Sequence, residues 1–87
     1  MAESKLSKLG TRALQELEGL VGCPAEGVSG IRKNDEGWVV LVDVLELERM
    51  PATTDVLGLY EVTMDGDGEV SGYRRVKRYL RSQVEER

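Results

Sequence analysis

Hydrophobic residues recur every three or four positions near the start of the chain, over residues 4–21. This period is typical of an amphipathic helix with one apolar stripe. The stripe consists of Leu6, Leu9, Ala13, Leu17 and Leu20, widened by Leu14 and Val21. The helix is predicted to end at Gly22, because glycine adopts the left-handed conformation easily and Pro24 cannot continue a helix. We expect the stripe to pack on a sheet; a docking surface for another protein is the alternative.

From Trp38 onward the pattern changes to that of a β-strand. Four β-branched residues follow in close succession, namely Val39, Val40, Val42 and Val44. The strand is predicted to run to Arg49 and to end at Met50-Pro51, because proline lacks an amide donor. A weaker alternation over residues 27–33 predicts a short edge strand before it.

A second long strand is predicted over residues 56–65, where it meets the sequence Asp65-Gly66-Asp67-Gly68. Alternating aspartate and glycine between apolar runs is a strong signal for a hairpin turn. The stretch from residue 69 to about residue 81 is therefore interpreted as the returning strand. Tyr73, Val76 and Leu80 would also line one side of a helix, which is the alternative.

These elements predict an α+β fold, with an N-terminal helix packed on a small antiparallel meander sheet of three to four strands. A chain of 87 residues suits one domain with a modest core, so residues 1–87 are interpreted as a single domain. Residues 1–3 and 82–87 are expected to be frayed.

The two sheet faces depend on register, and pairing Arg49 with Val56 is an assumption. It places one set of residues under the helix: Val39, Leu41, Leu45, Leu47, Tyr60, Val62 and Met64. The opposite face then holds Trp38, Val40, Val42, Val44, Leu57 and Leu59. A patch of that kind usually marks an interface, either with another protein or in a homodimer. Strong curl of the sheet, with the first strand or the tail covering the patch, is the alternative.

Charge is segregated along the chain, although the net charge is only −4. Residues 35–69 sum to −9, and residues 70–87 sum to +4. In the assumed register, Tyr73, Arg75 and Lys77 come near Glu61, Leu59 and Leu57, with Glu46 and Glu48 one strand further over, so the cations can pair with the protein's own acids. A face of Arg74, Arg78 and Arg81 can instead bind carboxylates of an acidic partner. Nucleic-acid binding through residues 73–81 is a further alternative, which the acidic segment opposes.

The residue types exclude most catalytic and metal chemistry. The chain has no histidine, and its one cysteine, Cys23, is interpreted as a small loop or core filler. The acids of the predicted turn do not form a calcium loop, because counting from Asp65 puts Val70 and Val76 where glycine and glutamate are required. We therefore predict no enzymatic activity, no cofactor and no metal. The longest apolar run, Trp38 to Val42, is too short to span a membrane, so a cytoplasmic protein is expected.

A set of elements between residues 20 and 81 resembles a known family, the gas vesicle protein O family. The elements are Gly30 with the turn to Gly37-Trp38, the corner Glu48-Arg49-Met50-Pro51, Asp55, Tyr60-Glu61-Val62, Asp65 with Gly68, and Tyr73-Arg74-Arg75 leading to Tyr79. The resemblance implies a non-enzymatic, chaperone-like accessory protein for gas vesicle assembly. Such a protein would bind the shell protein or other accessory proteins and could associate with gas vesicles.

The sequence thus leads to one hypothesis for a partner-binding surface, formed by a sheet face and the arginine-rich last strand. Its candidate residues are Trp38, Val42, Tyr73, Arg74, Arg75, Arg78, Tyr79 and Arg81.

Overall fold

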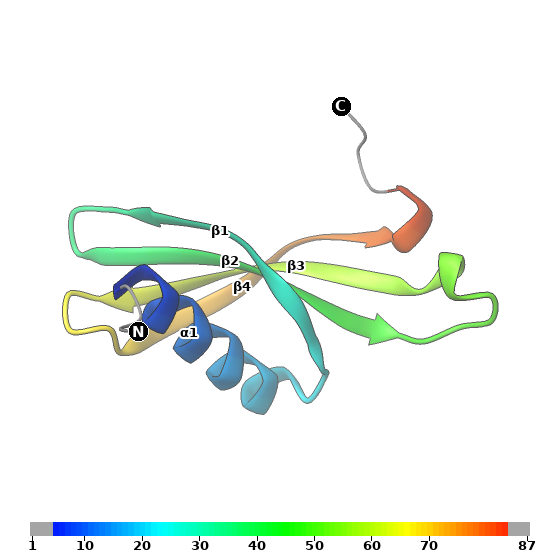
Figure 1. Ribbon diagram of the computed structural model, residues 1–87, viewed down its shortest axis with the longest axis horizontal. Helices are drawn as coiled ribbons and strands as arrows, with labels where there is room; N and C mark the ends of the chain where they lie inside the picture. Colours follow the sequence, from blue (N-terminus) through cyan, green and yellow to red (C-terminus); the bar gives the residue numbers. More distant parts are fainter. Residues whose placement is uncertain (1–4, 84–87) are drawn as a thin grey trace.

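The computed structural model describes residues 5–83, which form one helix and four strands (Figure 1). The elements are α1 (Lys5–Val21), β1 (Ala25–Lys33), β2 (Gly37–Leu47), β3 (Val56–Asp65) and β4 (Val70–Leu80), with short 3₁₀ turns η1 (Ala52–Thr54) and η2 (Arg81–Gln83). The strands form one antiparallel sheet in the order β1-β2-β3-β4. The predicted α+β meander is confirmed. The fraying expected for residues 1–3 and 84–87 lies outside the described residues, whereas Ser82 and Gln83 belong to η2.

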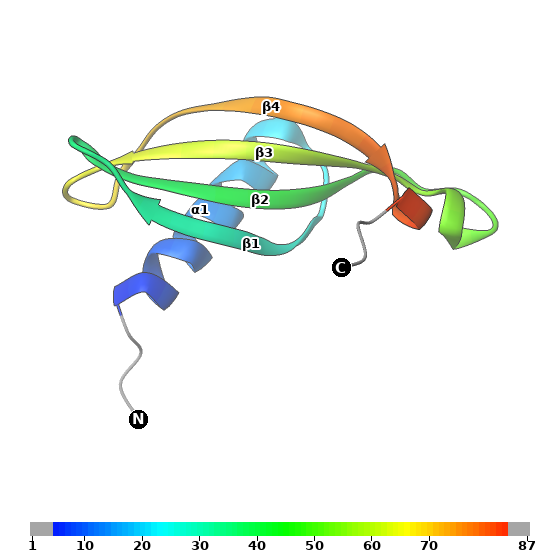
Figure 2. The same cartoon turned by 90° about the horizontal axis from the view of Figure 1, so that it is seen from above.

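Helix α1 packs diagonally across one face of the sheet, as Figure 2 shows. Leu9, Ala13 and Leu17 are buried against the strands. Gly22, at φ 72°, ends the helix as expected, and its N–H donates to the Glu18 carbonyl over 2.9 Å. The buried stripe is narrower than predicted, because Leu6 and Leu20 are 47% and 52% exposed.

The core lies between α1 and the middle of β2 and β3. Its strand residues are Val40, Val42, Val44, Tyr60, Val62 and Met64. In the observed register Val42 pairs with Tyr60 and Val40 pairs with Val62. The side of the sheet that faces α1 is therefore built from the even-numbered residues of β2.

The predicted face assignment of β2 was wrong. Leu47, not Arg49, pairs with Val56, a difference of two residues, and the irregularity between Leu45 and Leu47 adds a third, so that Leu45 pairs with Leu57. A register difference by an odd number of residues exchanges the two faces of a strand. Trp38, Val40, Val42 and Val44 consequently lie on the helix side, and the last three are fully buried.

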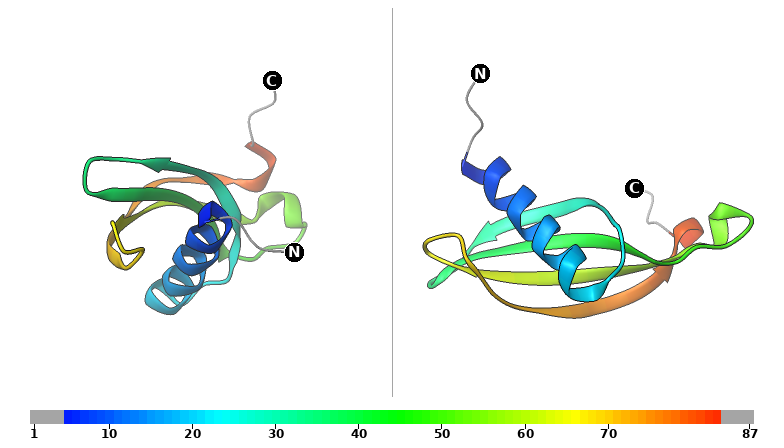
Figure 3. Two further views of the ribbon diagram at one scale, coloured as in Figure 1. Left: turned by 60° about the vertical axis from the view of Figure 1, so that its left-hand side comes forward. Right: turned by 90° about the horizontal axis from the view of Figure 1, so that it is seen from below.

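The helix-free face carries a second set of apolar residues: Val39, Leu41, Leu45, Leu57 and Leu59. Val39 and Leu57 are buried, and the other three are half-buried. The sheet curls strongly, so that Arg81 at the end of β4 bonds Glu26 of β1, although β1 and β4 are opposite edges (Figures 1 and 3). Curl therefore covers much of this face, which was the alternative to an open patch.

The sheet is longer than the region that α1 covers. The helix lies under the half that contains the two hairpin turns, and the opposite end, with the corner at residues 48–55, extends beyond it (Figure 1). Cys23, just after the helix, is half-buried against the core with a free thiol, as expected for a filler. No helix within residues 5–83 is long and apolar enough to cross a membrane.

Candidate partner-binding surface

The edge strand β4 distributes its cations over both faces of the sheet. Arg75 pairs with Tyr60 and Lys77 pairs with Leu59, so Val76 is an extra residue in the ladder. This bulge places Arg75 and Arg78 together on the helix side. Arg74, which pairs with Glu61, points to the other face.

Glu46 holds the two arginines of the helix side. Its carboxylate accepts hydrogen bonds from Arg75 Nε at 3.1 Å, Arg78 Nε at 3.0 Å and the Tyr60 hydroxyl at 2.7 Å. The Glu46 side chain is only 6% exposed. Burial by itself raises the pKa of Glu46, but the hydrogen bonds from Tyr60, Arg75 and Arg78 outweigh it and keep the pKa below its ordinary value.

Glu61 likewise binds two arginines, on the helix-free face. It accepts Arg74 Nε at 3.0 Å, and Arg32 Nη2 lies 3.6 Å from its second oxygen. The predicted pairing of cations with the protein's own acids is thus confirmed. The acids involved, Glu46 and Glu61, are among those expected, but Arg74, not Tyr73, pairs with Glu61, because the register of β3 and β4 differs from the assumed one by one residue there.

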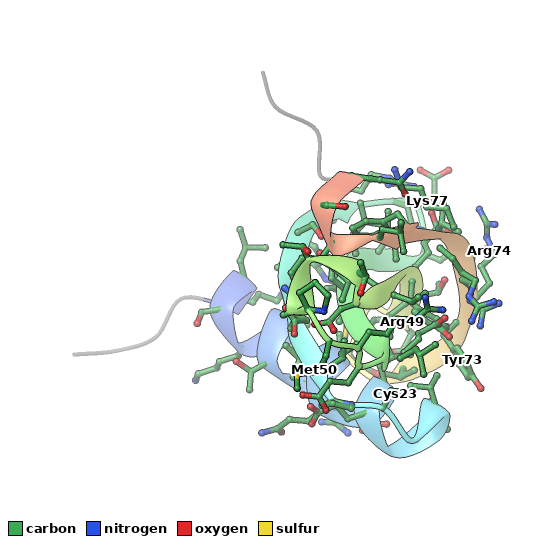
Figure 4. The ribbon with its side chains drawn as sticks, turned by 90° about the vertical axis from the view of Figure 1, so that its right-hand side faces the viewer. Cys23, Arg49, Met50, Tyr73, Arg74 and Lys77 are labelled. Carbon is green, nitrogen blue, oxygen red and sulfur yellow. The ribbon has the colours of Figure 1, made fainter. Side chains whose placement is uncertain are left out.

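This pairing leaves the surface cationic, because four guanidinium groups share two carboxylates. Arg74, Arg75 and Arg78 each donate through Nε, and among residues 5–83 their terminal nitrogens donate no hydrogen bond, although the Arg75 guanidinium lies 5.8 Å from the centre of the Tyr60 ring. Their side chains remain 68%, 44% and 55% exposed. We call these three residues, which lie along the edge strand β4 on both of its faces, the arginine strip. Arg74 extends outward from β4 in Figure 4.

Arg81 differs from the arginine strip because all three of its guanidinium nitrogens donate hydrogen bonds. Nη1 and Nη2 donate to the two oxygens of Glu26 at 3.0 and 3.1 Å, and Nε and Nη2 donate to Asp55 at 3.2 and 3.0 Å. The Asp55 carboxylate is buried and also accepts the Arg49 backbone N–H at 2.8 Å. That backbone hydrogen bond, together with Arg81, keeps the pKa of Asp55 below its ordinary value. Arg81 therefore ties β1, the corner and the end of β4 together.

The two tyrosines of β4 also differ. The Tyr79 hydroxyl donates to Asp43 Oδ1 at 2.6 Å, so its ring crosses β3 on the helix-free face, with Lys77 Nζ 5.6 Å from the ring centre. Burial and the bond to Asp43 raise the pKa of Tyr79. Tyr73 is 43% exposed and lies beside Tyr60, with ring centres 6.3 Å apart. Only Tyr73 accompanies the arginine strip at the surface.

Trp38 and Val42 do not join the arginine strip. Val42 is fully buried beneath α1, so its predicted exposure was wrong, and a homodimer through that face lacks the expected apolar surface. Trp38 is half-buried against the core, with Lys5 and Lys33 Nζ atoms 5.7 and 5.8 Å from its ring.

A groove that sequence reasoning missed lies at the corner end of the sheet. It has a volume of about 330 Å³ and is lined by residues that include Leu47, Arg49, Val56, Arg78, Leu80 and Gln83. We call it the corner groove. Leu47 is 46% exposed there, and Met50 on the adjacent corner is 95% exposed (Figure 4). The assumed register hid this groove by placing Leu47 under the helix. The signal available in the sequence was the pair of apolar residues Leu47 and Met50 directly before Pro51, where the strand was predicted to end.

The acidic side chains of the described residues are not grouped for metal binding. Within residues 5–83, no group of three or more histidine, cysteine, aspartate or glutamate side chains is placed to hold a metal ion. The carboxylates of Glu46 and Asp55 are instead occupied by arginine and backbone donors. The arrangement is that of a charged and partly apolar surface.

The family model and the relatives that match this chain all carry the name of one family. A family model described as gas vesicle synthesis protein GvpO matches residues 2–85. Gas vesicle protein O of Streptomyces sp. (strain CB03234) is 49% identical over 69 residues, covering 79% of this chain and 54% of that protein. Gas vesicle protein O1 of Halobacterium salinarum is 41% identical over 81 residues, covering 93% of this chain and 68% of that protein. Gas vesicle protein O of Haloferax mediterranei is 35% identical over 82 residues, covering 93% of this chain and 59% of that protein.

The chain thus spans between about half and two thirds of the length of these relatives. No solved structure matches it. Because the family model covers nearly the whole chain and the relatives align with most of it, this protein belongs to the gas vesicle synthesis protein GvpO family.

Proposed function

We propose that this chain is a non-enzymatic accessory protein that binds gas vesicle proteins during vesicle assembly, either the shell protein or other accessory proteins. Membership in a gas vesicle synthesis family supports an accessory role. The observation that carries the binding role is the arginine strip, whose terminal nitrogens donate no hydrogen bond within the described residues. In this role the protein works in the cytoplasm, in association with forming gas vesicles.

The arginine strip suits a carboxylate-bearing partner. Each Nε contact to Glu46 or Glu61 restrains a long side chain and leaves its terminal nitrogens available. A guanidinium that is already oriented loses less side-chain entropy when it binds, and its planar nitrogens match a carboxylate. The partner surface is therefore expected to be acidic.

Nucleic-acid binding or a regulatory role through residues 73–81 is less well supported. The net charge of −4 opposes binding to a polyanion. Tyr79 is bonded to Asp43 and its ring lies against the sheet, which leaves Tyr73 as the one tyrosine of β4 available for stacking on bases. A gel shift with mixed DNA and RNA near physiological salt is expected to show no complex.

Co-purification from cells that build gas vesicles tests the proposal. The variant Arg74→Gln with Arg75→Gln removes two cations of the strip, while Glu46 keeps Arg78 and Tyr60. We expect recovery of gas vesicle proteins to fall about tenfold or more, because charge-assisted hydrogen bonds are lost. Arg81 is unsuitable for this test, because it holds the fold through Asp55 and Glu26.

The matched control is Lys8→Gln with Arg12→Gln, which removes the same charge from exposed positions of α1. It is expected to leave recovery unchanged, and thermal unfolding should show both variants folded. Loss of partners in the α1 variant with full recovery in the β4 variant would contradict the proposal. That result would favour α1 as the docking surface.

A further inference from the structure

The corner groove is an uncovered continuation of the core face of the sheet. Val56 pairs with Leu80 on β4 and with Leu47 on β2, so the three side chains form an apolar floor beyond the end of α1. Leu47 is 46% exposed, and Met50 beside it is 95% exposed. Covering this floor removes apolar surface from water, which favours an occupant with an aliphatic side chain.

The rim of the groove is cationic. The Arg49 backbone N–H is bonded to Asp55, but no partner contacts its guanidinium among residues 5–83. Arg78 shares Glu46 with Arg75 and keeps its terminal nitrogens available. In Figure 4, which faces this end of the molecule, Arg49 and Met50 lie on the side turned to the viewer. An occupant with a carboxylate beside its aliphatic side chain complements both the floor and the rim.

We infer that the corner groove binds an acidic amphipathic segment of a partner polypeptide, with an aliphatic side chain on Leu47 and a carboxylate on Arg49. The inference rests on the proposed function and adds the chemistry of the partner. It concerns a different part of the surface from Arg74 and Arg75. The groove inference and the proposed function can therefore fail separately.

A second copy of this chain fits the groove less well. Leu20 is an exposed leucine with acids nearby on α1. Those acids are already bonded, however, because Glu16 accepts Arg12 and Glu18 accepts the Ala25 N–H at 2.7 Å. The acidic turn at residues 65–69 carries two glycines and no aliphatic side chain.

The test uses synthetic 14-residue peptides and methyl and amide NMR spectra of the whole chain. One peptide carries two leucines and three glutamates on an alanine and glutamine background. The others replace its glutamates by lysine or its leucines by alanine. We expect only the leucine and glutamate peptide to bind, with shifts concentrated at Leu47, Arg49, Val56 and Leu80. Higher ionic strength should weaken the binding.

Two matched pairs of variants locate the site. Leu47→Ser is expected to raise the Kd about tenfold because leucine burial is lost, while Leu6→Ser, at 47% exposure on α1, leaves it unchanged. Arg49→Gln is expected to raise the Kd about two- to fivefold, the effect of one exposed ion pair, while Arg32→Gln leaves it unchanged.

Several outcomes would overturn the inference: equal binding of the lysine peptide, shifts elsewhere on the molecule, or no response to Leu47→Ser and Arg49→Gln. Concentration-dependent self-association that Leu47→Ser abolishes would show that a second copy fills the groove. If co-purification persists in the Leu47 and Arg49 variants but is lost in the arginine-strip variant, the groove is excluded and the proposed function stands. If the wild-type chain binds the peptide but recovers no gas vesicle protein, the proposed function fails instead.

Discussion

The carboxylate of Glu46 lies directly over Gly58, the residue that faces Arg78 on the neighbouring strand. A Cβ atom built on Gly58 would come within 2.7 Å of Glu46 Cδ and 3.0 Å of Tyr60 Cε1. The missing side chain thus creates the space in which Glu46 meets Tyr60, Arg75 and Arg78. A glycine within a strand often marks such a close approach.

Gly58→Ala is therefore expected to destabilise the protein by about 1–3 kcal/mol, because the Glu46 carboxylate would have to move away from Tyr60, Arg75 and Arg78. Urea unfolding measures this. The control is Gly72→Ala on β4, where an added Cβ meets nothing within 4 Å. That change should be neutral or stabilising by about 0.4–1 kcal/mol, because alanine restricts the unfolded chain. Equal effects at the two positions would contradict the packing of Glu46 over Gly58.

A second prediction separates the two kinds of arginine on and after β4. Arg81→Gln leaves the buried Asp55 without its cation and removes the ion pair with Glu26 on β1. The curled sheet thereby loses a contact between its two edges. Arg74→Gln removes an ion pair whose arginine is 68% exposed, and such pairs contribute little. Thermal unfolding should show a decrease in Tm several times larger for Arg81→Gln than for Arg74→Gln. A larger decrease for Arg74→Gln would mean that the strip, not Arg81, holds the fold.

Local signals predicted the elements of this fold well. The apolar period placed a helix over residues 4–21, where the structure has Lys5–Val21, and the Asp65-Gly66-Asp67-Gly68 turn placed the last hairpin. The register across the corner could not be predicted in the same way. It depends on η1, on the irregularity after Leu45 and on the bond from the Arg49 N–H to Asp55. A register error of an odd number of residues there was enough for the prediction to place Val42 at the surface, whereas the structure has it in the core.

The candidate site shows the same limit. Composition located the cations of β4 correctly, but it could not separate Arg81, whose three guanidinium nitrogens all donate hydrogen bonds, from Arg74, which donates only through Nε within the described residues. That difference arises from contacts between strands distant in sequence, such as Glu26 with Arg81. The bulge at Val76, which brings Arg75 and Arg78 to one carboxylate, has no clear signal in the sequence.

A third prediction tests which side of α1 faces the sheet. Leu17 is fully buried, whereas Leu20 on the same helix is 52% exposed. Leu17→Ala should destabilise the protein by about 2–5 kcal/mol through lost burial and the cavity left behind. Leu20→Ala should change stability by less than about 0.5 kcal/mol. Urea unfolding at equilibrium measures both. The reverse order would place the helix in a different rotation on the sheet.

The last prediction concerns acid. In the folded protein the pKa values of Glu46 and Asp55 lie below their ordinary values of 4.5 and 3.8. The unfolded chain therefore takes up protons on these groups at a higher pH than the folded chain does, and the free energy of unfolding falls as pH decreases. Stability should be nearly constant close to neutral pH and should fall below about pH 5.

Glu46→Gln tests the contribution of one of these carboxyls. The variant should be less stable than the wild type at neutral pH, because Arg75 and Arg78 lose their shared charge. Its stability should also decrease less steeply below about pH 5, because one carboxyl with a lowered pKa is gone. The control Leu20→Ala, which removes an exposed side chain without an ionisable group, should keep the wild-type pH dependence. Urea midpoints measured at several pH values decide the matter: an unchanged slope in Glu46→Gln would show that other carboxyls account for the acid sensitivity.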